Sequence, residues 1–252
     1  MRTVSYTILH YGKDYLPYSL NSAYPFMDRL NVFFTPHPSH GHRVDIPPIE
    51  TEDELLGTAM LAIPDKLEWH KTDYWQEGPQ RNSAVTKCAM AGAQLLLVLD
   101  YDEVWPEEVL REALRYVWQQ NKAKDWLINF SHLWRSFNWV CTDDAWPVRI
   151  MDLRHTSGVA YLPREIGPIY HFGYAITDKV MSYKLAIHGH KNELRPGWFE
   201  EKWSAWPPVD NCHPTNDRKE NGEGWWNPVP FDKMKLPEIM RTHPYWNLEM
   251  IK

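Results

Sequence analysis

Short apolar runs alternate with segments of helical periodicity along the first half of the chain. Apolar, β-rich runs predict strands at residues 4–9, 31–35, 66–70, 94–99 and 126–130. Helical spacing and helix-start residues predict helices at residues 16–27, 51–62, 79–92 and 106–120. Thr51 and Glu54 form a capping box at the start of the second of these helices. Because strands and helices alternate, the sequence predicts an α/β fold with a mainly parallel sheet flanked by helices.

The pattern changes in the second half of the chain. From Trp198 onward the sequence holds six of the fourteen tryptophans and seven prolines, with little periodicity. We therefore expect one domain over residues 1–195, with a first half at 1–103 and a second half at 104–195. An irregular, aromatic- and proline-rich extension over residues 196–252 is expected to pack on it.

Composition narrows the class of protein. The 252 residues are 43% hydrophobic and 24% charged, which is typical of a globular chain, and a net charge of −6 gives no global basic field for nucleic acid. The three cysteines, Cys88, Cys141 and Cys212, form no CxxC pair and predict reduced thiols in a reducing compartment. No apolar run approaches the ~20 residues of a membrane helix. We expect a cytoplasmic protein, of a bacterium or of a phage-infected cell.

A cluster of carboxylates follows the most apolar run of the sequence. Residues 94–99 read as a central parallel strand, and Asp100, Asp102 and Glu103 come directly after it. In an open α/β sheet, ligands bind beyond the carboxyl ends of the strands. Clustered carboxylates there favour Mg²⁺ or Mn²⁺, completed by the phosphates of a substrate. The alternative is that these residues only cap the helix that begins at Pro106.

The setting of this motif resembles the GT-A glycosyltransferases, especially family-2-like enzymes. The likeness rests on Arg81-Asn82, a helix that ends at Gly92-Ala93, the apolar strand and Asp100-Tyr101-Asp102-Glu103. The first strand, helix and strand, over residues 7–36, are also similar to that family. The resemblance covers roughly residues 4–130 and implies a GT-A fold with a Rossmann-like, mainly parallel sheet.

The resemblance implies roles for donor-binding residues. Asp102 would coordinate the metal, and Asp100 would contact the metal or the ribose of a nucleotide-diphospho-sugar. Arg81 would lie near the diphosphate and Asp73 would face the nucleobase. The turn at His10, Tyr11 and Gly12 would cradle the nucleotide with backbone groups, and Tyr101 belongs to the same donor-binding set.

Two residues in the second half extend this site. His171, in a segment that resembles one found late in such transferases, would complete the metal shell, because imidazole binds Mn²⁺ alongside carboxylates. The alternative is a core histidine between Tyr170 and Phe172. Lys184 begins a basic stretch that could hold the diphosphate leaving group, and a solvated charged helix is the alternative.

An aromatic-rich segment at residues 134–146 supplies candidates for the acceptor side. An inverting transfer needs a carboxylate that takes the proton of the acceptor hydroxyl. Asp144 is the first candidate for this base and Asp143 the second, although paired aspartates also mark turns. Three tryptophans nearby are expected to line the acceptor cleft: Trp134, Trp139 and Trp146.

The leading hypothesis is a metal-dependent glycosyltransferase, with Mn²⁺ or Mg²⁺, that moves a sugar from a nucleotide-diphospho-sugar to an acceptor hydroxyl. A UDP-sugar and a glycan or polysaccharide acceptor are favoured. One alternative is a phage-type DNA glycosyltransferase that acts on a flipped, hydroxymethylated base. A non-catalytic carbohydrate-binding protein and a nucleotidyltransferase are the others, and the latter normally has a glycine-rich, basic loop after its first strand.

Overall fold

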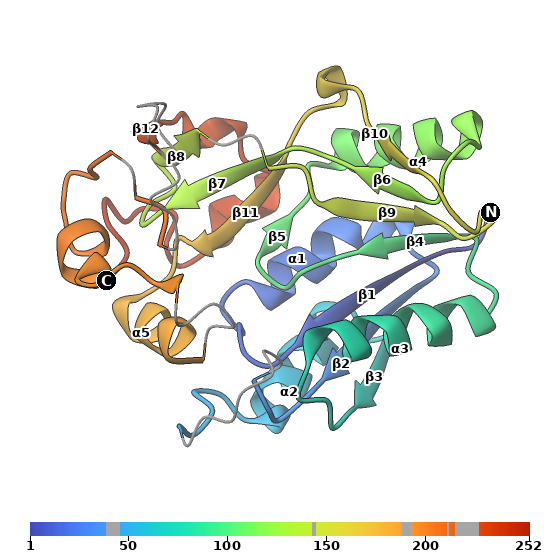
Figure 1. Cartoon of the computed structure of the whole chain (residues 1–252), viewed down its shortest axis with the longest axis horizontal. Helices are drawn as coiled ribbons and strands as arrows, with labels where there is room; N and C mark the ends of the chain where they lie inside the picture. Colours follow the sequence, from blue (N-terminus) through green and yellow to red (C-terminus); the bar gives the residue numbers. More distant parts are fainter. Residues whose placement is uncertain (39–45, 143–144, 188–192, 211, 215–226) are drawn as a thin grey trace.

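In the computed structural model of the chain, the residues that can be described form two β-sheets and five α-helices (Figure 1). The structure describes residues 1–38, 46–142, 145–187, 193–210, 212–214 and 227–252. Among these described residues, no helix is long and apolar enough to cross a membrane.

The larger sheet has seven strands in the order β10-β6-β9-β4-β1-β2-β3. Only β9 runs antiparallel to its neighbours. The bounds of the strands are β1 Thr3–Leu9, β2 Arg29–Phe34, β3 Leu67–Lys71, β4 Leu95–Val98, β6 Asp125–Leu127, β9 Val148–Asp152 and β10 Val159–Tyr161. The prediction of a mainly parallel α/β sheet is confirmed.

Helices α1 to α4 cover both faces of this sheet. Their bounds are α1 Leu16–Ala23, α2 Glu52–Ala62, α3 Glu77–Met90 and α4 Glu107–Gln120, whereas α5, at Asp178–Ile187, packs through Met181 with residues outside this sheet. Leu95 and Leu97 of β4 pack in a cluster with residues of α1, α2 and α4, whereas Leu96 and Val98 pack in another with α3. Alternate residues of β4 therefore enter two different cores, which explains why the strand is apolar throughout. The capping box of Thr51 and Glu54 forms as predicted.

The smaller sheet has five strands in the order β12-β8-β7-β11-β5. Their bounds are β5 Glu103–Val104, β7 Phe130–Trp134, β8 Trp139–Thr142, β11 Ile169–Tyr174 and β12 Asn227–Pro230. The prediction of one strand at residues 126–130 is wrong. The chain leaves the larger sheet after Leu127 and enters the smaller one at Phe130, because β6 pairs with β9 and β10 whereas β7 pairs with β8 and β11.

The last segment of the chain packs on the smaller sheet. Trp203, in a short helical turn at Phe199–Trp203, is fully buried beside Trp134 of β7. The guanidinium of Arg135 is also buried; it donates to the carbonyl of Trp203 and pairs with Asp178 at 2.7 Å. Several of the chain's tryptophans thus fill a core of their own, which joins the end of the chain to the second sheet.

Candidate functional site

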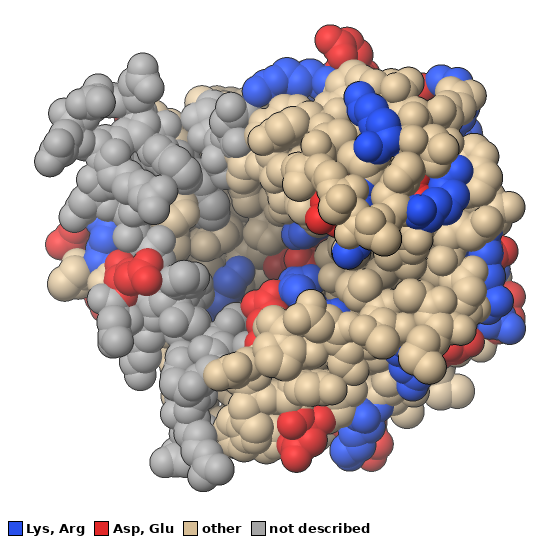
Figure 2. All heavy atoms as spheres, turned by 45° about the vertical axis from the view of Figure 1, so that its right-hand side comes forward, with Lys and Arg blue, Asp and Glu red and all other residues tan. Residues whose placement is uncertain are grey.

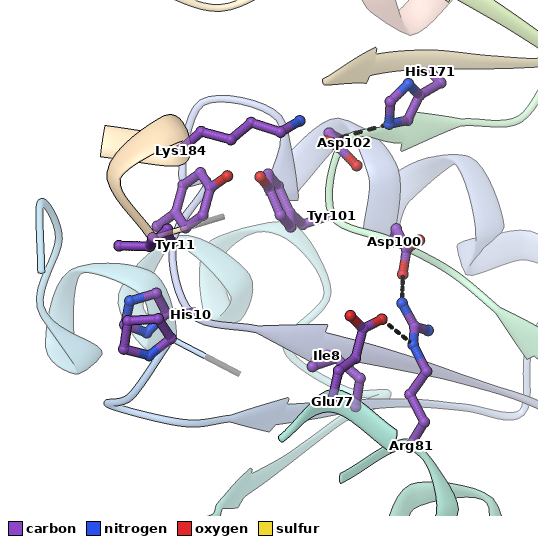
Figure 3. Close-up of a pocket in the computed structure, with 12 residues that line it drawn as sticks. Ile8, His10, Tyr11, Glu77, Arg81, Asp100, Tyr101, Asp102, His171 and Lys184 are labelled. Carbon is purple, nitrogen blue, oxygen red and sulfur yellow. Dashed lines mark hydrogen bonds and ion pairs between the residues drawn. The ribbon is translucent and has the colours of Figure 1, made fainter. Parts of the chain in front are cut away.

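A pocket of about 200 Å³ opens beyond the carboxyl ends of β1 and β4 (Figure 3). This is the edge of an open α/β sheet at which ligands bind. Figure 2 shows a hollow on this molecule in which basic and acidic side chains gather. Most of the predicted donor and metal residues line the pocket: His10, Tyr11, Arg81, Asp100, Tyr101, Asp102, His171 and Lys184.

Asp100 lies between two arginines. Its Oδ1 accepts from Arg81 at 3.1 Å and its Oδ2 from Arg149 at 2.8 Å. Burial alone would raise the pKa of Asp100, but the two guanidinium groups outweigh it and hold the pKa well below its usual range. Asp100 is therefore a charged carboxylate, and each of its oxygens accepts a hydrogen bond from an arginine.

Glu103 lies behind the pocket and is fully buried. Arg149 donates from Nε to both carboxylate oxygens of Glu103, each at 2.9 Å. Burial raises the pKa of Glu103 to about 8, against the lowering effect of Arg149. Arg149 thus contacts both Asp100 and Glu103, which lie on either side of Asp102 in the sequence.

Asp102 and His171 face each other on the pocket wall (Figure 3). Oδ2 of Asp102 lies 3.5 Å from Nε2 of His171, and the two side chains are 7% and 14% exposed. Burial would raise the pKa of Asp102, but His171 and then Lys184 lower it more, so the carboxylate is charged. An oxygen and a ring nitrogen at this separation can both contact one cation.

Gly173 leaves the space between these two groups open. A Cβ on Gly173 would lie 2.7 Å from Nε2 of His171 and 2.8 Å from Oδ2 of Asp102. The register of β11 shifts between His171 and Tyr174, so this glycine sits in an irregular part of the strand. Bulges of this kind often re-aim side chains next to functional sites.

The residues fit a divalent cation held by two protein groups. Among the described residues, no group of three or more His, Cys, Asp and Glu side chains could hold a metal ion. The role predicted for Asp100 as a further ligand stays a prediction, since each of its oxygens accepts one hydrogen bond from an arginine and keeps another lone pair. Mg²⁺ commonly takes only one or two protein carboxylates and completes its shell with water and substrate phosphates. Asp102 and His171 satisfy that lower requirement.

Lys184 brings a positive charge to the same pocket. It comes from α5, and its Nζ donates to the carbonyl of Gly173 at 2.9 Å and lies 4.6 Å from the ring centroid of Tyr174. Burial lowers the pKa of Lys184, whereas Asp102 and Asp100 raise it. The ammonium group and the Arg81 guanidinium stand on the pocket wall, where each can contact an anionic ligand.

The amide of Gly12 is not offered to the pocket, which corrects the expected role of this residue. The backbone N–H groups of Gly12 and Lys13 donate to Oε2 of Glu50, at 2.6 and 3.0 Å. Glu50 is buried, and burial raises its pKa. Gly12 has a φ of 118°, and a Cβ there would lie 2.1 Å from the ring of Tyr101. This glycine is required by close packing and by its backbone conformation.

The three tryptophans expected at the acceptor cleft lie apart. Trp134 is fully buried, stacked on Tyr174, which contradicts a role in the cleft. Trp139 lies in β8 beside Trp206 and is not among the residues that line the pocket. Trp146 lines a separate surface hollow with Tyr161. Leu133 and Trp134 are both fully buried, so both faces of β7 are covered here, and this could not be read from the sequence alone.

Two further expectations concern acidic residues. Asp73 is 81% exposed and pairs with His37 at 2.6 Å; it is not among the lining residues of the pocket. The candidate bases Asp143 and Asp144 lie outside the described residues.

Some residues of the site were not found from the sequence. Arg149 donates to Asp100, and Glu77 accepts from Arg81. His132 contacts His171. The single arginine within an apolar strand at residues 148–152 was a usable signal, because a charged residue that faces into a sheet needs a partner. His132 has no comparable signal in the sequence.

Comparisons with known proteins give partial likenesses. No family model and no curated protein matches the sequence. Among solved structures, S. aureus TarS 1-349 is 14% identical with a TM-score of 0.38, over 53% of this chain and 36% of that chain. A putative nucleotide-diphospho-sugar transferase from Desulfovibrio desulfuricans G20 is 11% identical, with a TM-score of 0.35 over 52% and 59%.

A third structure covers more of both chains. It is 4-diphosphocytidyl-2C-methyl-D-erythritolsynthase from Anaerococcus prevotii DSM 20548, 10% identical with a TM-score of 0.40, over 75% of this chain and 96% of that one. The match to the TarS fragment spans little more than a third of that structure's length. All three TM-scores are below 0.5, and these likenesses do not assign the chain to a family.

Proposed function

We propose that this chain is a metal-dependent glycosyltransferase that uses a nucleotide-diphospho-sugar, with a UDP-sugar favoured as donor. One observation carries the proposal. Asp102 and His171 face each other across 3.5 Å in a pocket that Arg81 and Lys184 also line. A cation-binding pair beside two positive side chains suits a diphosphate, which needs both a metal and cationic neighbours.

The pocket residues have separate tasks in this proposal. Asp102 and His171 would hold Mg²⁺ or Mn²⁺, which supplies Lewis-acid stabilisation of the diphosphate when bound. Lys184 and Arg81 neutralise the negative charge that develops on the departing diphosphate. Asp100 keeps Arg81 in place at 3.1 Å, and Glu77 holds the same guanidinium from α3 at 2.5 Å. The site thus stabilises a leaving group by positioned charges.

The turn after β1 favours sugar transfer over nucleotidyl transfer. Nucleotidyltransferases use a glycine-rich, basic loop at this place, whose amides bind phosphates. In this chain the carboxylate of Glu50 accepts the hydrogen bonds of Gly12 and Lys13. Because the same amides cannot also bind a phosphate, we favour a diphosphate that leaves from the Asp102 side of the pocket.

A surface hollow is the proposed acceptor side. Trp146, Tyr161 and Arg164 line it together with Leu162. β4, β6 and β10 run in the same direction, so this hollow follows the same sheet edge as the pocket. It lies three strands from β4, about 15 Å at roughly 4.8 Å per strand. Aromatic faces and an arginine suit an acceptor glycan, and Tyr161 is 62% exposed.

The proton of the acceptor hydroxyl needs a base. Asp144 stays our first candidate and Asp143 our second, because both follow β8 directly in sequence and precede Trp146. Attack of the acceptor oxygen on the anomeric carbon would break the bond to the diphosphate, and the base would take the hydroxyl proton.

The test is release of nucleotide from a panel of UDP- and GDP-sugars in the presence of Mn²⁺. We expect at least one donor to be turned over by the wild type, and Asp102→Asn to lower that rate at least about 100-fold. Asp53→Asn, an exposed aspartate in α2, is the matched control and should behave as the wild type. No donor binding with either metal, measured by calorimetry, would refute the proposal.

A further inference from the structure

His132 contacts His171 from the neighbouring strand. β7 and β11 are parallel, and His132 and His171 occupy the same register position in the two strands. Nδ1 of His132 lies 2.8 Å from Nδ1 of His171, which is a hydrogen-bond distance. His132 is 5% exposed and is not among the residues that line the pocket. It therefore reaches the site only through the other histidine.

A stacking contact with Phe130 also holds the ring of His171. Phe130, two residues before His132 in β7, stacks on it with a centroid distance of 5.3 Å and an interplanar angle of 7°. The two histidine rings are nearly perpendicular, at 84°. Stacking fixes the plane of the His171 ring, and the Nδ1 contact selects one of the two ring flips about the Cβ–Cγ bond. Together they point Nε2 toward Asp102.

A hydrogen bond between two Nδ1 atoms requires that one carries a hydrogen and the other a lone pair. If His171 donates from Nδ1, its Nε2 keeps a lone pair and can bind a cation. If His132 donates instead, Nε2 of His171 carries the hydrogen and can only donate to Asp102. The second arrangement turns Nε2–H toward the charged carboxylate of Asp102, 3.5 Å away, so it suits the metal-free protein. A cation bound to Nε2 requires the first arrangement.

We propose that His132 is a positioning residue of this site, which holds the His171 ring and accepts its Nδ1 hydrogen when a divalent cation is bound to Nε2. The proposal rests on the proposed function. Second-shell partners of this kind are typically worth 10- to 100-fold in metal affinity.

Two variants separate positioning from packing. His132→Phe keeps a ring of similar size beside Phe130 and removes the acceptor, whereas His132→Asn keeps a polar atom close to the position of Nδ1. The thermal midpoint of each variant reports whether the fold is intact. Mn²⁺ affinity, measured by electron paramagnetic resonance in the presence of UDP, reports the site. Nitrogen-15 spectra of the histidine rings, with Mg²⁺ and UDP, report the tautomer of His171.

We expect His171 in the wild type to carry its hydrogen on Nδ1 when Mg²⁺ and UDP are bound, and His132→Phe to weaken Mn²⁺ binding about 10- to 100-fold. His132→Asn should restore most of that affinity. Unchanged Mn²⁺ affinity in His132→Phe would overturn the proposal and leave the proposed function standing, as would a hydrogen on Nε2 of His171 in the metal-bound wild type. If the wild type binds no Mn²⁺, the proposed function and this proposal fail together.

Discussion

Arg149 and Glu103 form a pair away from solvent, with Nε of the arginine 2.9 Å from both oxygens of the glutamate. The same guanidinium reaches Asp100 through Nη2 at 2.8 Å. One side chain of β9 thus binds a carboxylate before Asp102 and another after it. The conformation of the Asp102 turn depends on this arginine.

Removing Arg149 leaves two carboxylates without their shared partner. We expect Arg149→Met to lower the free energy of unfolding by about 3–5 kcal/mol, as for other broken buried ion pairs. Urea unfolding followed by circular dichroism measures it. The double variant Arg149→Met/Glu103→Gln should recover part of the loss, because the fully buried carboxyl group that lost its partner is then removed. Equal stabilities of the single variant and the wild type would contradict this account of the turn.

Gly173 tests whether the space beside Asp102 is used. A Cβ would approach Nε2 of His171 and Oδ2 of Asp102 to 2.7 and 2.8 Å, so Gly173→Ala should displace one of them. We expect nucleotide release to fall about 100-fold, with little change in the thermal midpoint. Gly57→Ala is the control, since a Cβ on Gly57 in α2 would meet nothing within 4 Å. Full activity of Gly173→Ala would exclude this space as a cation site.

Substitution of Tyr161 in the surface hollow and substitution of the buried Trp134 should affect different properties of the protein. Tyr161→Ala removes an exposed ring, and we expect the acceptor KM to rise roughly 10-fold, which corresponds to about 1.4 kcal/mol, while donor hydrolysis is unchanged. Steady-state kinetics with and without acceptor separates the two. Trp134→Ala should instead lower stability by about 3–5 kcal/mol, because its ring is fully buried. Loss of donor hydrolysis in Tyr161→Ala would argue against an acceptor role.

His243 should make stability fall in mild acid. Burial lowers its pKa from 6.5 to about 4. In the folded protein its Nε2 lies 3.1 Å from the carbonyl of Asp14, and its Nδ1 accepts from the amide of Tyr245 at 3.0 Å, so the ring is satisfied only when neutral. Since the unfolded chain takes up the proton more readily, this contribution is complete above about pH 6.5. It is lost as the pH falls toward 4, by up to about 3 kcal/mol.

The measurement is urea unfolding of the wild type and of His243→Phe at pH 7.5 and pH 4.5. The phenylalanine preserves the stack against Tyr15, where the ring centroids are 4.6 Å apart. It should be less stable than the wild type at pH 7.5, and it should lose less stability between the two pH values. The same pH dependence in both proteins would show that His243 does not titrate as described.

Local patterns were sufficient for β1 to β4 of the larger sheet and for part of the site. The capping box at Thr51 and the apolar run of β4 depend only on neighbouring residues, and both formed as predicted. Asp100 and Asp102 follow that run directly, so their place at the carboxyl end of a strand also followed from the sequence. The course of the chain after Leu127 did not, because a strand can change partners without any change in its apolar pattern.

The sequence by itself determined the α/β alternation, the buried central strand and the carboxylates at its end, since these depend on hydrophobic period and residue order. Only the tertiary structure decided which groups meet there. Arg149 and Asp100 are 49 residues apart, and His132 and His171 are 39 apart. Their contacts arise because strands distant in sequence become neighbours in a sheet. The same pairing buries Trp134, because β7 lies between β8 and β11 inside the smaller sheet and both of its faces are covered.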